Sequence, residues 1–200
     1  MKQNPIALLL IIFVILLPTA AFSDHIKDHY IAPEDEPASN KQNNVFYTEQ
    51  EAVEKLFPKA DKFDSKKIIL NDEQRGRVAK RVGHDLFEAS FDVFIAKKGS
   101  KILGYAIAGE ELGKFRAITS MVAIDPKGKV LDVVVMIYRE SHGEDVKRKR
   151  FLYQYKGKSI KSPVRINKDI MTITSATISV RSMNRQVRKV ISVVHEAFIA

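Results

Sequence analysis

A stretch near the end of the chain, "TITSATISVRSM" (Thr172–Met183), carries six hydroxyl side chains among twelve residues. After Thr177 the apolar residues recur at helical spacing, which predicts an amphipathic helix running almost to the C-terminus. The positions that carry this pattern are Ile178, Val180, Met183, Val187, Val190, Ile191, Val194 and Phe198. The hydroxyls therefore lie before and within the first turn of a helix. A helix N-terminus has unpaired N–H groups and a positive dipole end, and it binds phosphate readily.

Two interpretations of the hydroxyls follow. In the first, one Ser or Thr caps the helix, a contact worth about 1 kcal/mol. In the second, the hydroxyls and the positive charges of Arg181 and Arg185, one and two turns into the helix, form a phosphate site. A cap needs only one hydroxyl, whereas four crowd this position: Thr174, Ser175, Thr177 and Ser179.

Earlier elements must position this helix. Two short helices are predicted, one beginning after Thr48 and ending before Pro58, the other capped by Asn71 and ended by Gly83. Alternating apolar residues then predict four antiparallel strands as two hairpins, the second closed by the turn Asp125–Gly128. The order of elements predicts an α+β fold, with a curved, mainly antiparallel sheet flanked by helices and ending in the C-terminal amphipathic helix.

The fourth strand ends at a loop, Glu140–Gly143, and a predicted short helix and a turn at Gly157 follow. Four consecutive basic residues, Lys147–Arg150, lie at the start of this segment. A solvated face is the simplest interpretation of such a run, and docking to a membrane surface or an acidic partner is the alternative.

The N-terminus resembles an export signal, because Lys2 precedes the apolar run Ile6–Leu17 and Ala21-Phe22-Ser23 offers small residues for cleavage. We therefore expect a signal peptide over residues 1–23, cleaved after Ser23, with an uncleaved membrane anchor as the rival interpretation. Residues 24–44 are polar and lack periodicity, which predicts a flexible lead-in, and residues 45–200 form the domain. The expected location is the periplasm or outside the cell, with membrane association as a further option.

The amino-acid composition excludes several kinds of functional site. The 200-residue chain has no cysteine, which excludes disulfides, a thiol nucleophile, a cysteine-ligated iron–sulfur cluster and a CxxCH haem site. The formal net charge of +9 favours an anionic membrane or an acidic partner, since nucleic acid is a poor partner for an exported protein. His25 and His29 lack a third ligand nearby, so no metal site is expected.

The segment "TSATIS" (Thr174–Ser179) resembles the S/T-G-A-T-x-S/T motif of the FMN-binding domain family. Members include the NqrC component of the sodium-pumping NADH:quinone oxidoreductase and the RnfG component of the Rnf complex. The segment from Gly113 to Gly143 also resembles the family's hairpin, whose closing loop carries a glutamate and ends in glycine. The similarity extends from about Phe46 to the C-terminus.

The resemblance implies that FMN is joined by its phosphate to the side-chain oxygen of Thr177, a bond that a flavin transferase makes from FAD. The other motif residues are implied as cofactor contacts: Thr174, Ser175, Ala176, Ile178 and Ser179. Glu140, Ser141 and His142 are candidates for contacts with the flavin ring or its ribityl chain. No catalytic residue is assigned.

Two residues depart from the family pattern. Ser175 replaces the usual glycine, and if that position needs a left-handed backbone, Ser costs about 1–2 kcal/mol there. Met171 stands where many members have an acidic residue, six positions before the acceptor, and the neighbouring Asp169 is the candidate to replace it.

The sequence therefore predicts an exported electron-transfer flavoprotein with covalent FMN, a carrier or a subunit of a membrane redox complex more than a stand-alone enzyme. Flavin carries electrons without thiolate ligands, which fits the absence of cysteine. One alternative is a degenerate family member that binds flavin or another phosphate ligand without a covalent bond. The other is an interaction module without a cofactor.

Overall fold

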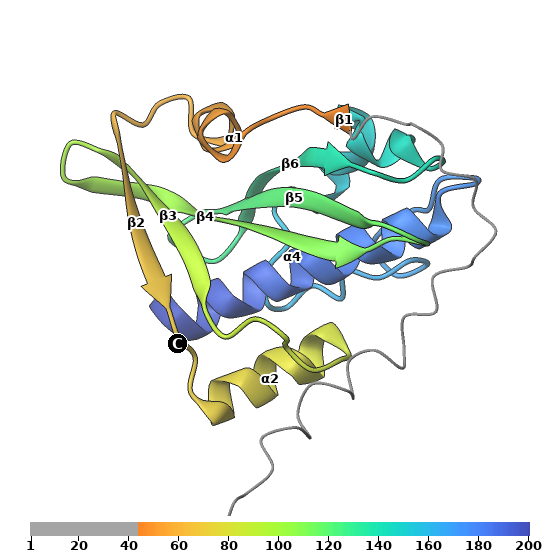
Figure 1. Cartoon of the computed structure of the whole chain (residues 1–200). Helices are drawn as coiled ribbons and strands as arrows, with labels where there is room; N and C mark the ends of the chain where they lie inside the picture. The colour runs from red at the N-terminus through yellow and green to blue at the C-terminus, as the bar shows by residue number, and fades with distance from the viewer. Residues whose placement is uncertain (1–43) are drawn as a thin grey trace, which may run out of the picture. The chain divides into compact units, whose positions relative to one another are not determined.

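The computed structural model describes residues 44–200, and the predicted signal, the lead-in to residue 43, and with them His25 and His29, lie outside the described residues. A six-stranded antiparallel sheet runs through this part, in the order β1-β6-β5-β4-β3-β2 (Figure 1). Its strands are β1 (Asn44–Val45), β2 (Lys62–Ile68), β3 (Phe91–Lys98), β4 (Lys101–Leu112), β5 (Ala117–Ile124) and β6 (Val130–Tyr138).

Four helices accompany the sheet within residues 44–200: α1 (Glu49–Leu56), α2 (Asp72–Val82), α3 (Lys149–Leu152) and α4 (Thr177–Phe198). Two 3-10 turns, Glu144–Lys147 and Tyr153–Tyr155, flank α3. The predicted α+β fold is confirmed, including the C-terminal helix. None of these helices is both long enough and apolar enough to cross a membrane.

Helices cover both faces of the sheet. Alternate residues of β5 separate into two cores: Ile118 and Val122 pack in the core shared with α4, and Met121 and Ala123 pack in the core shared with α1. Helix α2 lies against α4, on the side of α4 that faces away from the sheet (Figure 1). The long helix α4 is therefore held between the sheet and a second layer.

The predicted ends of the first two helices are confirmed. Thr48 and Asn71 each form a capping box with the residue three positions later, and Gly83 ends α2 in the left-handed conformation, with φ of 98°. These contacts are local, which is why the residue pattern predicts them.

The four-strand prediction is incomplete, because β1 and β2 add a strand at each edge of the sheet. Four of the seven residues of β2, "KFDSKKI", are exposed, and three of its residues are lysines. Such a strand lacks the apolar alternation of a buried one, and lysine is common on edge strands. It is paired along its length with β3, from Lys62–Lys97 to Ile68–Phe91.

Candidate functional site

The N-terminus of α4 has no side-chain cap. The N-cap residue is Ala176, and no side-chain hydroxyl accepts a hydrogen bond from the first-turn N–H groups. The capping interpretation of the hydroxyls is therefore not what the structure shows. The helix start keeps the unpaired N–H groups and positive dipole end that suit a phosphate.

The hydroxyls of the motif divide into exposed and buried ones. Thr174, Ser175 and Thr177 are exposed, as is Ile178, whereas Ser179 is buried. The Thr172 hydroxyl donates a hydrogen bond to the Thr177 Oγ1 at 3.4 Å. The predicted acceptor oxygen is thus accessible, and its hydroxyl neighbour comes from the segment that leads into the helix.

Ser175 has a left-handed backbone, with φ of 68°. This is the conformation for which the family's usual glycine is suited, because a Cβ there collides with the backbone. The position is therefore left-handed, which is the condition under which strain at Ser175 is predicted from the sequence. The chain keeps the motif's backbone shape although it lacks the glycine.

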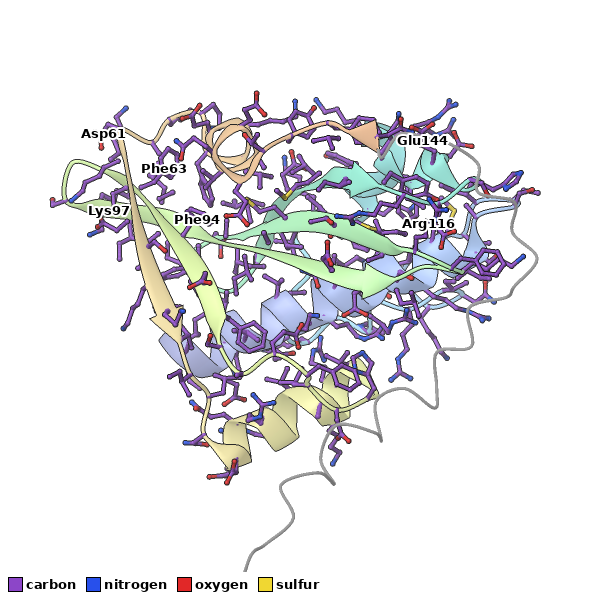
Figure 2. All side chains as sticks on the ribbon, viewed as in Figure 1. Asp61, Phe63, Phe94, Lys97, Arg116 and Glu144 are labelled. Atoms are coloured by element: carbon purple, nitrogen blue, oxygen red, sulfur yellow. The ribbon has the colours of Figure 1, made fainter. Side chains whose placement is uncertain are left out.

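Glu140 holds the backbone of a turn. Its Oε1 accepts hydrogen bonds from the backbone N–H groups of Phe115 at 2.7 Å and Arg116 at 3.0 Å. These residues belong to the turn between β4 and β5. Arg116 and Glu144 both lie toward the end of the sheet where α4 begins (Figure 2).

The rest of the loop is fastened to the first turn of α4 through Tyr138. The Tyr138 hydroxyl donates to the His142 carbonyl at 2.5 Å and lies 2.9 Å from the Ser179 Oγ. Burial raises the pKa of the Tyr138 phenol, and nearby carboxylates raise it further, although the Ser179 contact opposes them. The phenol therefore stays protonated and able to donate this bond.

Gly143 makes the close approach of this loop possible. Its φ is 86°, and a Cβ at this position would stand 2.7 Å from the Ser179 Oγ and 3.4 Å from the Ala176 Cβ. The structure thus brings the loop Glu140–Gly143 against the hydroxyl motif. The side chains of Ser141 and His142 are exposed and bond to each other, Oγ to Nδ1, at 2.9 Å.

A hollow of about 420 Å³ lies beside the motif, with Met171, Thr172 and Ile173 on one side and residues of the α3 region on the other. The latter are Asp145, Arg148, Arg150, Phe151 and Gln154. Arg148 forms an ion pair with Asp145 at 2.5 Å. The sequence pattern does not single out this hollow, because the α3 region shows no recognisable binding motif.

Asp169 does not replace the missing acidic residue in any contact seen here. Its carboxylate accepts hydrogen bonds from the backbone N–H groups of Arg165 at 2.9 Å and Val164 at 3.2 Å, and it pairs with Lys158 at 3.0 Å. Burial raises the pKa of this carboxyl, but the backbone bonds and Lys158 outweigh burial and hold the pKa below its ordinary value. Met171 is 75% exposed.

Within residues 44–200 no three potential metal-ligating side chains of His, Cys, Asp or Glu gather at one place. The features around the motif are instead those that bind a phosphate group. An exposed threonine hydroxyl, an uncapped helix start and a left-handed residue at the glycine position all fit the phosphate end of a nucleotide.

Comparison with known proteins agrees with this geometry. Residues 113–192 match the model of the FMN-binding domain family, a span that includes the β4–β5 turn, the Glu140–Gly143 loop and the motif. The matched span covers 80 of the chain's 200 residues and supports FMN as the cofactor.

One curated relative is the G component of the proton-translocating ferredoxin:NAD(+) oxidoreductase complex of Clostridium ljungdahlii. It is 27% identical over 130 residues, covering 62% of this chain and 70% of the relative. Two solved structures are similar: NqrC of Shewanella oneidensis, and the C component of the Na(+)-translocating NADH-quinone reductase of Parabacteroides distasonis. The first has a TM-score of 0.47 and 16% identity and covers 70% of this chain and 82% of that one. The second has a TM-score of 0.48 and 12% identity and covers 78% and 87%.

Proposed function

We propose that the chain is an exported electron-transfer flavoprotein that carries FMN through a phosphoester bond to the Thr177 Oγ1. One observation carries the proposal: the Thr177 hydroxyl is exposed at a helix N-terminus that no side chain caps. A hydroxyl in that place can reach an incoming phosphate, and the free N–H groups of the first turn can bind the phosphate oxygens.

The covalent step balances with FAD as the flavin donor. The Thr177 oxygen forms a bond to phosphorus, the pyrophosphate bond of FAD breaks, AMP leaves, and the hydroxyl proton is released. The Thr172 hydroxyl donates to the same oxygen, so the proton of Thr177 is not needed for that contact. A flavin transferase is the partner that this step requires.

FMN supplies one- and two-electron chemistry that no side chain of the described residues offers. The chain's own residues anchor and orient it. Thr177 holds the phosphate end, and the hollow bordered by Thr172 and Arg150 is available to the rest of the molecule. Glu140 and Tyr138 act indirectly, because they fix the loops that meet at the motif.

The redox partner is proposed from the relative's name. The G component of a proton-translocating ferredoxin:NAD(+) oxidoreductase complex belongs to an assembly that moves electrons and ions, and a corresponding place in a membrane redox complex is proposed for this chain. The N-terminal sequence supports export, so the predicted location is the periplasmic side. N-terminal sequencing of exported protein should then begin at Asp24, whereas a chain that retains Met1 in the membrane would mean an anchor instead.

The test of covalent FMN is the intact mass of the full chain, exported and co-expressed with a flavin transferase. We expect a gain of one FMN less one water. Thr177→Val removes the nucleophilic oxygen while keeping the side-chain shape, so the gain should disappear. Thr174→Val is the matched control, since it removes an exposed hydroxyl three positions before the helix starts, and it should lower the yield without abolishing the gain.

The outcomes separate the alternatives. Flavin that is present but lost on denaturation would support non-covalent binding, and no flavin under any condition would leave an interaction module. If Thr177→Val still gains the mass, the acceptor is another hydroxyl of the motif. If the wild-type chain is unmodified but Ser175→Gly or Met171→Asp restores the gain, the departures from the family pattern explain the failure.

A further inference from the structure

A second pocket, of about 400 Å³, lies along α4 and is rich in arginine. Helix α4 contributes Arg181, Asn184, Arg185 and Arg188, and the loop before it contributes Arg165, Ile166 and Asn167. Four of these seven lining residues are arginines, and none carries a carboxylate. The residues of α4 share one stripe with Thr177, because they follow it by 4, 7, 8 and 11 positions in a helix of 3.6 residues per turn.

Only one of these four arginines pairs with a carboxylate of the described residues. Arg185 pairs with Glu111 at 3.1 Å, outside the lining of the pocket. The two terminal nitrogens of Arg188 donate hydrogen bonds to the carbonyls of Val164 and Val82, and these neutral acceptors do not neutralise its positive charge. Burial lowers the pKa of the Arg188 guanidinium, and the neighbouring arginines, Arg165 first among them, lower it further. Arginine nevertheless stays protonated in proteins, so the repulsion remains.

Several donors of the pocket have no acceptor among the described residues. The side chains of Arg165 and Arg181 form no hydrogen bond or ion pair with any of residues 44–200. The Arg188 side chain is only 9% exposed, and its Nε is buried without a hydrogen-bond partner. A buried donor left without a partner destabilises the fold, and a cluster of like charges destabilises it further. An oxyanion in the pocket would offset the repulsion between these cations, since guanidinium groups match the oxygens of phosphate in pairs.

The pocket extends too far along α4 to serve only a phosphate held at Thr177. At about 1.5 Å of rise per residue, Arg188 lies roughly 16 Å along the helix axis from Thr177. We propose that Arg165, Arg181, Arg185 and Arg188 form a binding site for a phosphate-class oxyanion, separate from the phosphate of FMN. The ligand is a free phosphate or the phosphate group of a small monoester, which the pocket volume also admits.

The proposal is tested by isothermal titration of inorganic phosphate into the full chain, in chloride buffer at fixed ionic strength. The variant is Arg165→Gln/Arg181→Gln, in which both arginines are exposed and neither side chain forms a hydrogen bond within residues 44–200. The matched control is Lys161→Gln/Lys168→Gln, which removes two exposed charges from the same loop region outside the pocket. We expect saturable phosphate binding by the wild type and the control, and at least tenfold weaker binding by the arginine variant.

Titrations of the flavin-free Thr177→Val chain and of the flavinylated chain decide whether the site is separate. Equal phosphate affinity in both forms supports a second site, and it does so whether or not FMN proves to be covalent. Loss of phosphate binding on flavinylation would show that the pocket serves FMN itself and would overturn the proposal. The proposal also fails if the wild type does not bind phosphate above chloride, or if the lysine control loses as much affinity as the arginine variant. Titration with glycerol phosphate in place of inorganic phosphate then tells a monoester from the free ion.

Discussion

Ser175→Gly tests whether the motif stores backbone strain. Ser175 has φ of 68°, is exposed, and its side chain forms no hydrogen bond within residues 44–200, so the substitution removes little besides a strained Cβ. Relief of the left-handed backbone should gain about 1–2 kcal/mol. Glycine also gives the unfolded chain more freedom, which takes back about 0.4–1 kcal/mol. The net expectation is a rise of about 0.5–1 kcal/mol in the free energy of unfolding.

The assay is urea unfolding of the flavin-free full chain, followed by circular dichroism, together with thermal unfolding. A gain of this size corresponds to a rise of about 1–4 °C in Tm for a domain of this length. Thr174→Gly is the control, because Thr174 has no positive φ and so offers no strain to relieve. That variant should lose about 0.4–1 kcal/mol. If Ser175→Gly is no more stable than Thr174→Gly, the strain argument is wrong.

Three further variants test contacts around the site. Asp169→Asn should lower the free energy of unfolding by about 1–2 kcal/mol at neutral pH. Because the folded-state pKa of the Asp169 carboxyl is depressed, this contribution is present above about pH 4 and is lost as the pH falls through the folded-state pKa. The urea midpoints of the variant and the wild type should therefore converge in acid. Ser179→Ala should cost about 1 kcal/mol by removing the buried contact with Tyr138, and equal unfolding midpoints would contradict this. Lys189→Met should cost about 1.5–3 kcal/mol in the same unfolding assay, because the buried Glu111 carboxylate loses the Lys189 ammonium at 2.9 Å and keeps only Arg185 at 3.1 Å.

The elements that sequence predicts well are those whose signals are local. The capping residues Thr48 and Asn71 and the terminal Gly83 mark helix ends through contacts with neighbours three or four residues away. The alternating apolar residues of β3 to β6 indicate strands whose side chains are buried in the cores on the two faces of the sheet. Strands β1 and β2 carry no such mark, because their structure comes from pairing with β6 and β3 and not from their own side chains.

In the candidate site, too, local features can be recognised in the sequence and contacts between distant segments cannot. Its acceptor motif and loop are each contiguous in sequence, so both can be recognised there, and the structure brings Gly143 against Ala176 and Ser179. The role of Tyr138 cannot be recognised in the sequence, since it joins two segments 41 residues apart. Glu140 is polar and lies in the right loop, which predicts a ligand contact, whereas its bonds to the β4–β5 turn depend on the folded hairpin.

The largest departure from the sequence pattern lies in α4 itself. An amphipathic helix should expose its polar stripe, yet Asn184, Gln186, Arg188 and Lys189 are all buried. Lys189 pairs with Glu111 of β4, so part of the stripe turns to the sheet. The second layer formed by α2 and the loops before α4 covers Arg188 and supplies the Val82 and Val164 carbonyls as its partners. A hydrophobic pattern reports which face meets the sheet, but it cannot report that the other face is covered as well. Polar residues on a covered face need partners or ligands, and the arginine-lined pocket beside Arg188 is therefore the place where a bound oxyanion is to be sought.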